Sequence, residues 1–591
     1  MSMLVADMET SYWERTDSFE RKMKLVEQAW ARKDFRLARA LLASLRTTAM
    51  QAQQEELNLG APLDASVHAV ADLPEGWRQW AAGWRHYQIV QVDETAGVGR
   101  PPEPIEIVLR GEAASLAREV RVAAVEGPGL REVPSQVTSE ILRGQQRLCR
   151  LLFFASGGPH QRQTYLVFYG NPDAELPEYP SDLRVTGEGF GLDIENDFFK
   201  ASLSRQMGQL ERLAFKREHG LELFAGGEGH GEPPGIDWAH DYVGSGNFQK
   251  LRITLWDQCP DYEVVRGPLC TTVRRWGFPH SPVHPVFSPS RIHFDVEYRF
   301  YAGVPWFQKV GRTDVIQDVE IDALRDDEWV FSGQSFTEMV WMGADGKLRS
   351  GAVDPAQSEN LWGVGFYHKT AEDAFIALFL DHHGDNTGEL RHNASPQMFY
   401  KWHGPVWSRY PLKAGLLKAG SVLHQRNAYL ALRYTEESGP RLVEGIRHRM
   451  LNPLAVSAGT LPKNTSGGEI RGRLARIGEA GDSPISKKVI WDALRDCKDE
   501  QLYKSDLNVV DLGLVFDVRI RAGTVHLVMA MPHRGRPRLG FFSYGSGGNS
   551  MPIRQRLMRI PGVQKVDFQQ TWDPGWSSNN LTAEGRSKLG L

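Results

Sequence analysis

The feature that most constrains the fold is a run of short alternating segments from about residue 75 to residue 455. Apolar and polar residues alternate in pieces such as IEIVLRG, LRITLWD and NAYLALRYTE, and clusters of Gly, Pro, Asn and Asp separate these pieces. Alternation with a period of two is typical of strands with one buried face, and the clusters are typical of turns. No long helical period interrupts the run, so the sequence predicts one or two large β-sandwiches.

The length of the chain predicts several domains, because 591 residues exceed what one hydrophobic core usually supports. Two helices between residues 17 and 57, with apolar side chains at helical spacing, predict packing or homo-oligomer contacts. We expect a helical segment over 1–75, an accessory β-domain over 76–185, a large β-sandwich over 186–455, a Gly/Ser-rich linker over 456–483, and a small α+β domain over 484–591.

Composition argues against several classes of function. Lys and Arg number 69 against 73 Asp and Glu, and this balance gives no reason to expect a nucleic-acid or membrane partner. No run of about 18 apolar residues occurs and the N-terminus is too polar for a signal peptide, so we expect a cytoplasmic protein. The four cysteines form no CxxC pair, and GxGxxG and GxxxxGK[ST] are absent, so we expect neither a thiolate metal site nor a nucleotide cofactor.

The C-terminal region carries motifs of a known family. The segment 510–515 reads VDLGLV, Pro-Gly-Val follows at 561–563, Trp-Asp-Pro at 572–574, and the chain ends in LTAEGRSKLG followed by one further residue. These pieces resemble the PaaD-type metal–sulfur cluster biosynthesis family, which implies a small α+β fold over 484–591. The family places a reactive Cys-Pro after the second strand, where this chain has Arg536-Pro537. Because the thiol is missing, we interpret the domain as a docking or covering module rather than a cluster-assembly unit.

The strand pattern in the middle of the chain carries a second resemblance. The stretch LDIENDFFKASLSRQMGQLERLAFK predicts strands with a turn near Gly208, and VEYRFYAGVPWFQKVGRTDV predicts long central strands. This pattern resembles the galactose-mutarotase-like β-sandwich over about 190–450. The resemblance implies a mainly β fold and a carbohydrate-like substrate, although a fold alone does not fix a function.

Four histidines within residues 378–410 form the first candidate site. Neutral imidazoles and a carboxylate suit a divalent metal ion, which makes His383, His392 and Asp385 candidate ligands. The same stretch also offers a proton-transfer set, His382, His403, Tyr400 and Arg409. Its strand, FIALFLD, is expected to end at Asp381, with His382 and His383 beginning a loop. A metal site, a metal-free acid–base site and a structural polar loop all remain open at this point.

The second candidate site is the stretch from Arg274 to Phe300. A Pro-rich loop presents His280, and His293, Asp295, Glu297 and Arg299 alternate on the strand that follows, so they share one face. Such a face is either an ordinary solvated surface or, if it lines a concave side, a carboxylate platform. Aromatic and cationic side chains that could contact a sugar are Arg275, Trp276, Trp402 and Trp407.

Together these features predict a carbohydrate-active enzyme, a lyase or hydrolase, that cleaves a glycosidic or related C–O bond in a small glycoside- or uronate-like substrate. Elimination needs a neutral His or Tyr as base and an Arg, protonated His or metal to stabilise the enolate. Hydrolysis needs a carboxylate pair, for which Glu297 with Asp295 or Asp385 is the candidate. The alternative is a ligand-binding or cluster-maturation accessory protein without catalysis.

Overall fold

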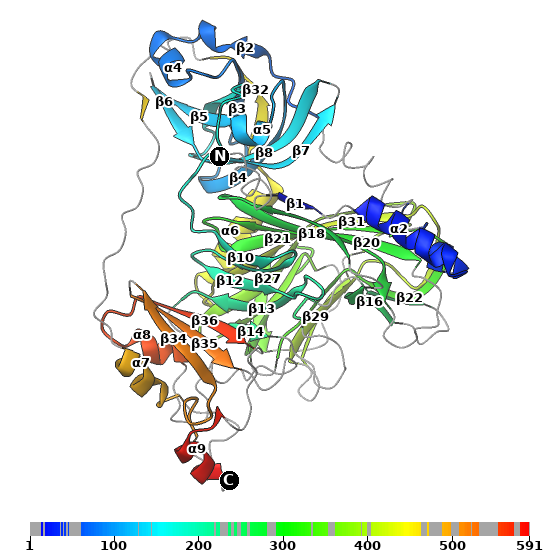
Figure 1. Ribbon diagram of the computed structural model, residues 1–591, viewed down its shortest axis with the longest axis vertical. Coiled ribbons are helices and arrows are strands. Elements are labelled where there is room, and N and C mark those ends of the chain that lie inside the picture. Colours follow the sequence, from blue (N-terminus) through cyan, green and yellow to red (C-terminus); the bar gives the residue numbers. More distant parts are fainter. Residues whose placement is uncertain are drawn as a thin grey trace.

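The computed structural model shows three bodies in a row: an accessory β-domain, a central sandwich and a C-terminal α+β unit (Figure 1). Helix α2 (Ser18–Ala31) lies along one side of the sandwich. The structure describes residues 13–15, 18–35, 37–39, 41–42, 45, 61–127, 129–143, 145–217, 220–224, 235–237, 241–244, 250–256, 260–280, 291–332, 335–352, 361–391, 393–398, 404–461, 470–471, 487–497, 507–521, 523–530, 553–571 and 580–589.

One face of the central sandwich is a ten-stranded antiparallel sheet. In spatial order its strands are β1 (Trp13–Arg15), β17 (Asp261–Arg266), β18 (Cys270–Gly277), β20 (Ile292–Tyr301), β21 (Trp306–Val315), β31 (Val422–Arg433), β27 (Asp373–Asp385), β26 (Gly363–His368), β24 (Glu338–Met342) and β25 (Leu348–Ala352). These strands hold the longest alternating segments of the sequence. Period two therefore gives the sheet one apolar inner face and a distinct outer face.

Three smaller sheets cover the inner face. The first contains β10 (Arg184–Glu188), β11 (Gly191–Glu195), β12 (Phe199–Leu203), β13 (Leu210–Phe215) and β14 (Glu222–Phe224). The second contains β19 (Pro279–His280), β16 (Lys250–Trp256), β15 (Asp241–Gly244), β22 (Val319–Arg325) and β30 (Gly415–Leu417). The third contains β23 (Asp327–Val330), β29 (Pro405–Tyr410) and β28 (Asn393–Met398).

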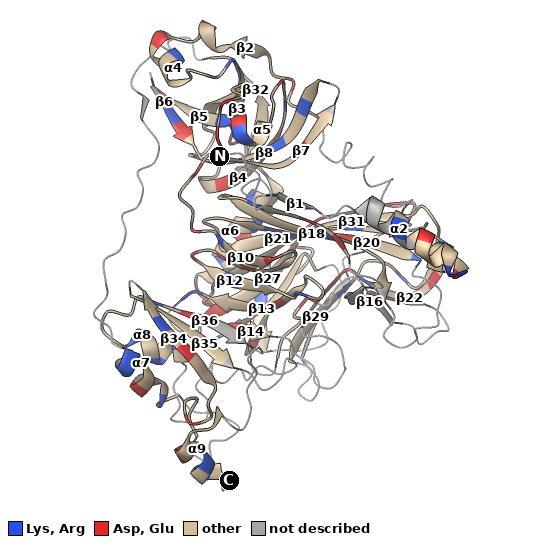
Figure 2. Ribbon diagram, in the orientation of Figure 1, with Lys and Arg blue, Asp and Glu red and all other residues tan. Residues whose placement is uncertain are grey.

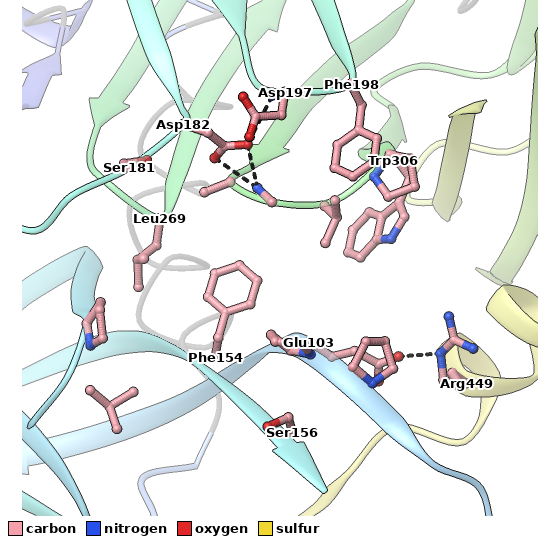
Figure 3. Close-up of a pocket in the computed structure, with 18 of the residues that line it drawn as sticks. Glu103, Phe154, Ser156, Ser181, Asp182, Asp197, Phe198, Leu269, Trp306 and Arg449 are labelled. Atoms are coloured by element: carbon pink, nitrogen blue, oxygen red, sulfur yellow. Dashed lines mark hydrogen bonds and ion pairs between the residues drawn. The ribbon is translucent and has the colours of Figure 1, made fainter. Parts of the chain in front are cut away.

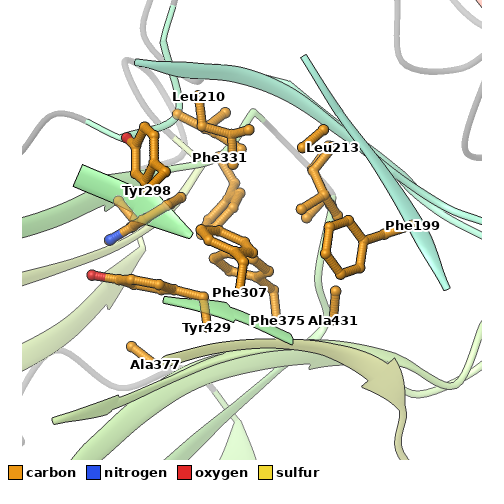
Figure 4. Close-up of a cluster of buried hydrophobic side chains, with 14 of the residues drawn as sticks. Phe199, Leu210, Leu213, Tyr298, Phe307, Phe331, Phe375, Ala377, Tyr429 and Ala431 are labelled. Carbon is orange, nitrogen blue, oxygen red and sulfur yellow. The ribbon is translucent and has the colours of Figure 1, made fainter. Parts of the chain in front are cut away.

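The core of the sandwich is unusually aromatic. Phe199 of β12 and Leu213 of β13 meet Phe307, Phe375 and Tyr429 of the ten-stranded sheet, and all five are buried (Figure 4). The rings of Phe307 and Tyr429 stack with centroids 5.2 Å apart. Large rings bury much apolar area for each residue that is ordered, which favours a rigid sandwich.

A fully buried asparagine ties two turns of the sandwich together. The Asn196 side-chain amide donates to the carbonyl oxygens of Tyr301 and Val304, at 3.0 and 2.9 Å. Its oxygen accepts from the backbone N–H groups of Phe198 and Phe199. The β11–β12 turn is thereby fixed to the β20–β21 turn. The turn predicted near Gly208 joins β12 to β13, and Gly208 has a positive φ of 68°.

The accessory β-domain packs two further sheets against each other. The larger one contains β2 (Val67–Ala69), β3 (His86–Asp93), β9 (Arg162–Tyr169), β5 (Arg121–Glu126), β6 (Gly129–Val133), β33 (Ile470–Arg471) and β32 (Ala455–Ala458). The smaller one contains β4 (Arg100–Gly111), β8 (Gln146–Gly157) and β7 (Ser135–Arg143). The short helices here are α4 (Glu75–Trp80), α5 (Leu116–Glu119) and the 3₁₀ turn Val70–Asp72. The chain thus returns from the sandwich to this domain, and part of the predicted linker forms its strands.

The C-terminal unit is the small α+β arrangement that the sequence predicts. Its elements are α7 (Lys487–Leu494), β34 (Val515–Arg521), β35 (Thr524–Ala530), α8 (Ile553–Met558), β36 (Lys565–Thr571) and α9 (Ala583–Leu589). Arg554 of α8 is buried against the sandwich, where it donates to the backbone oxygen of Phe215 and to Glu222 at 2.6 and 3.0 Å. A buried charge pair across the junction fixes how the two units meet.

The predicted mainly β fold is confirmed, and one element boundary is corrected. Strand β27 does not end at Asp381 but continues to Asp385 after a register shift between Phe379 and Asp381. His382 and His383 therefore lie on a strand and not at the start of a loop. Lys/Arg and Asp/Glu are interspersed over the described elements, as the near-zero net charge predicts (Figure 2). Among the described helices, none is long and apolar enough to cross a bilayer.

Candidate active site

The outer face of the ten-stranded sheet is divided into an apolar and a charged half. Helix α6 (Gly439–Leu451) and Leu152 of β8 cover the apolar half. The charged half is built by alternation on β20, where Asp295, Glu297 and Arg299 point outward while Phe294, Val296 and Tyr298 enter the core. The sequence prediction that these charged residues share one face is therefore correct. Strands of the accessory β-domain cover this face.

A cavity of about 280 Å³ lies between this charged face and strands β4, β7 and β8 of the accessory β-domain. Its lining contains four guanidinium groups, those of Arg150, Arg274, Arg299 and Arg312. It also contains the carboxylates of Glu106, Glu140, Glu263, Asp295 and Glu297, together with the imidazole of His424. The lining thus contains both hydrogen-bond donors and acceptors. The volume of the cavity is close to the lower end of ordinary ligand pockets.

Ion pairs fix the carboxylates at the floor of the cavity. Arg274 holds Asp295 in a two-pronged contact, with Nε 3.0 Å from Oδ1 and Nη2 2.7 Å from Oδ2. Arg299 pairs with Glu297 beside it and reaches Glu106 on β4 at 3.5 Å. Planar guanidinium–carboxylate pairs are geometrically specific, so these side chains are held in fixed orientations.

Glu297 is held in its ionised form. Burial alone would raise the pKa of Glu297, but the guanidinium groups of Arg299, Arg150 and Arg274 outweigh burial and leave the pKa below its usual value. The side chain is 18% exposed, so it still faces the cavity. An ionised carboxylate in this position can accept a hydroxyl hydrogen bond or a proton, but it cannot serve as an acid.

His424 of β31 supplies the imidazole of the cavity. Burial lowers the pKa of His424, and the neighbouring His383 and Arg312 lower it further, while Asp314 and Asp385 act in the opposite direction. The His383 ring stacks on the His424 ring with centroids 4.6 Å apart and planes 18° apart. Near neutral pH His424 is therefore a neutral base.

The predicted pair His382 and Arg409 lies on the other face of the sheet, inside the sandwich. His382 Nε2 contacts Asn427 Oδ1 at 2.8 Å, and its Nδ1 lies 3.9 Å from Asp326 Oδ2. Arg409 forms an ion pair with the same carboxylate. Burial raises the pKa of Asp326, and the Arg409 guanidinium partly offsets this. The structure thus joins His382 and Arg409 through Asp326, in an enclosed position.

A buried lysine lies beside this pair. Lys309 Nζ is 3.2 Å from Asp237 Oδ1 and 3.1 Å from Asp327 Oδ1, and all three side chains are at most 1% exposed. Asp327 also accepts the indole N–H groups of Trp329 and Trp407, at 3.0 and 2.8 Å. A buried carboxylate with this many donors is a structural anchor of the sandwich interior.

Three of the predicted sugar-contacting residues lie in the described part of the chain, and all three are buried. Trp407 and Arg275 are fully buried. Arg275 donates to the Met207 backbone oxygen and lies over the Tyr298 ring. Trp276 is 3% exposed, under the guanidinium of Arg274 at 5.0 Å. Of these three described residues, Trp276 borders the charged half of the outer face.

The remaining predicted residues are placed as follows. His392, Tyr400, Trp402 and His403 lie outside the described residues, as does the side chain of His280. His383 and Asp385 are exposed at the end of β27. Within the part of the chain that the structure describes, no three His, Cys, Asp or Glu side chains group closely enough to hold a metal ion. The metal site stays a prediction.

Sequence reasoning missed His424, Arg312 and Arg150. Arg312 belongs to the recognised strand segment WFQKVGRTDV, whereas His424 lies just before the recognised segment NAYLALRYTE, on β31, which begins at Val422. Their alternation could have assigned these side chains to the outer face. What the sequence could not give is the register that puts Arg312 opposite both Asp295 and His424. Arg150 comes from another domain, so only tertiary structure reveals it.

Comparisons with known proteins give distant similarities of fold. No known family model matches the chain, and no curated protein matches it. A protein of glycosyl hydrolase family 38 from Enterococcus faecalis aligns over 73% of this chain and 52% of its own, at 10% identity and a TM-score of 0.40. A galactose 1-epimerase from Lactobacillus acidophilus NCFM aligns over 44% of this chain and 100% of its own, at 5% identity and a TM-score of 0.27.

The chain therefore spans about half the length of the glycosyl hydrolase family 38 protein. Similarities of this size assign neither a family nor an activity. The chemistry has to be read from the cavity.

Proposed function

We propose that this chain is a carbohydrate-active enzyme that breaks a C–O bond of a small uronate-like sugar by elimination in the polar cavity. The observation that carries the proposal is the meeting of a neutral imidazole, His424, with four guanidinium groups in a cavity of about 280 Å³. A sugar ring presents hydroxyl groups that both donate and accept hydrogen bonds, which matches a lining that contains both donors and acceptors.

Elimination fits the ionisation states better than hydrolysis does. Hydrolysis needs a carboxylic acid to protonate the leaving oxygen, but Glu297 is held ionised by three guanidinium groups. Elimination needs a base and a cationic group. His424 removes the proton on the carbon α to the substrate carboxylate, and an Arg of the lining stabilises the negative charge that develops there.

The bond changes are simple. The C–H electron pair becomes the new C=C bond, and the β C–O bond breaks with its electrons on oxygen. The proton on His424 can return to that oxygen, so His424 acts as base and then as acid. Glu297 and Asp295 accept hydrogen bonds from the ring hydroxyls, which orients the sugar for proton removal.

The product distinguishes the two reactions. The protein is incubated with a uronate-terminated oligosaccharide, and the products are followed by ultraviolet absorbance and mass spectrometry. We expect an unsaturated sugar, seen as new absorbance with no mass of water added. Glu297→Gln keeps the size of the side chain and removes its charge, and we expect a lower rate with the same product.

Two results would overturn the proposal. A saturated product that carries the mass of water would show hydrolysis. Tight binding of the sugar without any turnover, equal in wild type and Glu297→Gln, would show a binding protein.

A further inference from the structure

A second and much larger space lies along the same domain boundary. It has a volume of about 1520 Å³, roughly five times that of the polar cavity. The accessory β-domain forms one wall, and the sandwich with α6 forms the other (Figure 3). On β8, Arg150 lines the small cavity and Phe154 lines this groove, with the buried Leu152 between them on the same face of the strand. The two spaces are therefore neighbours but separate.

Apolar side chains project into the groove from both walls. Phe198 and Trp306 come from the sandwich side, and Phe154 comes from the accessory β-domain (Figure 3). Phe198 and Leu442 are 38% and 44% exposed, which is high for large apolar side chains. Flat rings on both sides of a groove suit the C–H faces of sugar rings or other flat apolar ligands.

The arginines of the groove are already paired with carboxylates. Arg449 pairs with Glu103, and Arg131 pairs with Glu126 at 2.7 Å. The other arginines of the lining are Arg162, Arg217 and Arg433, and they pair with Asp93, Asp373 and Glu372. The lining also contains the carboxylates of Asp182 and Asp197. With its arginines paired and two further carboxylates present, the lining favours hydrogen bonds to hydroxyl groups over an anionic ligand.

The backbone of the lining does not suit an extended peptide. Six prolines line the groove, namely Pro101, Pro102, Pro134, Pro180, Pro268 and Pro305. Proline has no N–H group, so these positions cannot donate to the main chain of an added strand. The Asp182 carboxylate is also occupied, because it accepts the Gly303 and Asp197 backbone N–H groups.

We infer that this groove binds an uncharged oligosaccharide chain of several sugar units. The ligand class follows from aromatic faces on both walls, arginines that are already paired with carboxylates, and a volume several times that of the single-sugar cavity. The inference rests on the proposed function only in taking sugars as ligands of the neighbouring cavity. It concerns binding and not bond cleavage, so the two can fail separately.

The test is a binding measurement by isothermal titration calorimetry on the full chain. The probes are cellohexaose, xylohexaose, mannohexaose and β-1,4-galactohexaose, with hexagalacturonate as the charged comparison and a proline-rich peptide as the non-sugar comparison. The variants are Phe198→Ala and Leu442→Ala, which are exposed enough to leave the fold intact. Phe516→Ala is the matched control, since Phe516 is 49% exposed on the C-terminal unit.

We expect at least one neutral hexasaccharide to bind, with affinity about tenfold weaker in Phe198→Ala and unchanged in Phe516→Ala. Glu297→Gln should also leave this affinity unchanged, because Glu297 lines the other space. The inference is overturned if no neutral probe binds, if only the acidic probe or the peptide binds, or if Phe198→Ala and Leu442→Ala bind as the wild type does. Absence of turnover would count against the proposed function alone.

Discussion

At the residue scale, the proposed elimination depends on the neutral state of His424. His383 lowers the pKa of His424, whereas Asp385 raises it. Removing His383 should therefore raise this pKa, and removing Asp385 should lower it. A base works only when it is unprotonated, so activity is lost as the pH falls through its pKa.

Substitution of His383 and substitution of Asp385 should shift the pH profile of the reaction in opposite directions. In His383→Ala the acid limb of kcat/KM against pH should move to higher pH, and in Asp385→Asn it should move to lower pH. The measurement is the pH dependence of elimination for the wild type and both variants. A profile that shifts the same way in both, or in neither, would remove His424 as the titrating base.

The charged residues of β20 could be predicted because period two assigns them to one face without any knowledge of the fold. Adjacent residues of a strand point to opposite faces, so only one of His382 and His383 can face a given space. In the structure His382 is inside the sandwich and His383 is outside, stacked on His424. What could not be predicted is the register shift in β27, which decides which of the two histidines lies inside the sandwich and which lies outside. Register depends on pairing with β31, some 40 residues further along the chain.

At the scale of elements, the sandwich is held by polar side chains inside turns as well as by its aromatic core. Asn196 makes four hydrogen bonds between two turns and is 1% exposed. In Asn196→Ala two buried carbonyl oxygens, the buried N–H of Phe199 and the partly buried N–H of Phe198 lose this partner. We expect the free energy of unfolding to fall by roughly 3 kcal/mol.

Urea denaturation of the wild type and Asn196→Ala measures this change. Asn452→Ala is the comparison, because the Asn452 side chain is exposed and bonds only within its own helix end. A loss below about 1 kcal/mol in Asn196→Ala would mean that water replaces the missing amide.

The strands of the chain could be predicted from alternation, and so could α7, α8 and the hairpin around Gly523 in the C-terminal unit. The pairing of β32 and β33 with the accessory β-domain could not. Residues 456–483 look like a linker because they are rich in Gly and Ser and carry little apolar period. The strand state of β32 and β33 depends on edges that an earlier part of the chain leaves open.

At the scale of the whole molecule, buried polar contacts join the central sandwich to its neighbours. Arg554 is the clearest, since it is 5% exposed and bonds to Glu222 and to the Phe215 backbone oxygen. In Arg554→Ala the Glu222 carboxylate loses the nearer of these two arginines, since Arg212 lies 3.5 Å from it. We expect the C-terminal unit to separate more readily from the sandwich.

Limited proteolysis checks this expectation, with mass spectrometry to locate the cuts. Cleavage at the described sides of the junction, β14 (Glu222–Phe224) and α8 (Ile553–Met558), should be faster in Arg554→Ala than in the wild type. Arg556→Ala is a matched control on the same helix, because Arg556 bonds to Asp496 within the C-terminal unit. Equal rates in all three proteins would show that the junction does not depend on Arg554.

In the proposed reaction, the polar cavity between the ten-stranded sheet and the accessory β-domain is the catalytic site, and His424 is the base. Its test is the initial rate of unsaturated product formation by wild type and His424→Ala at neutral pH, with His448→Ala as a surface-histidine control. We expect a loss of about 10²–10⁴-fold in His424→Ala, and an unchanged rate in His448→Ala. A His424→Ala variant that is folded and as active as the wild type would rule out His424 as the base.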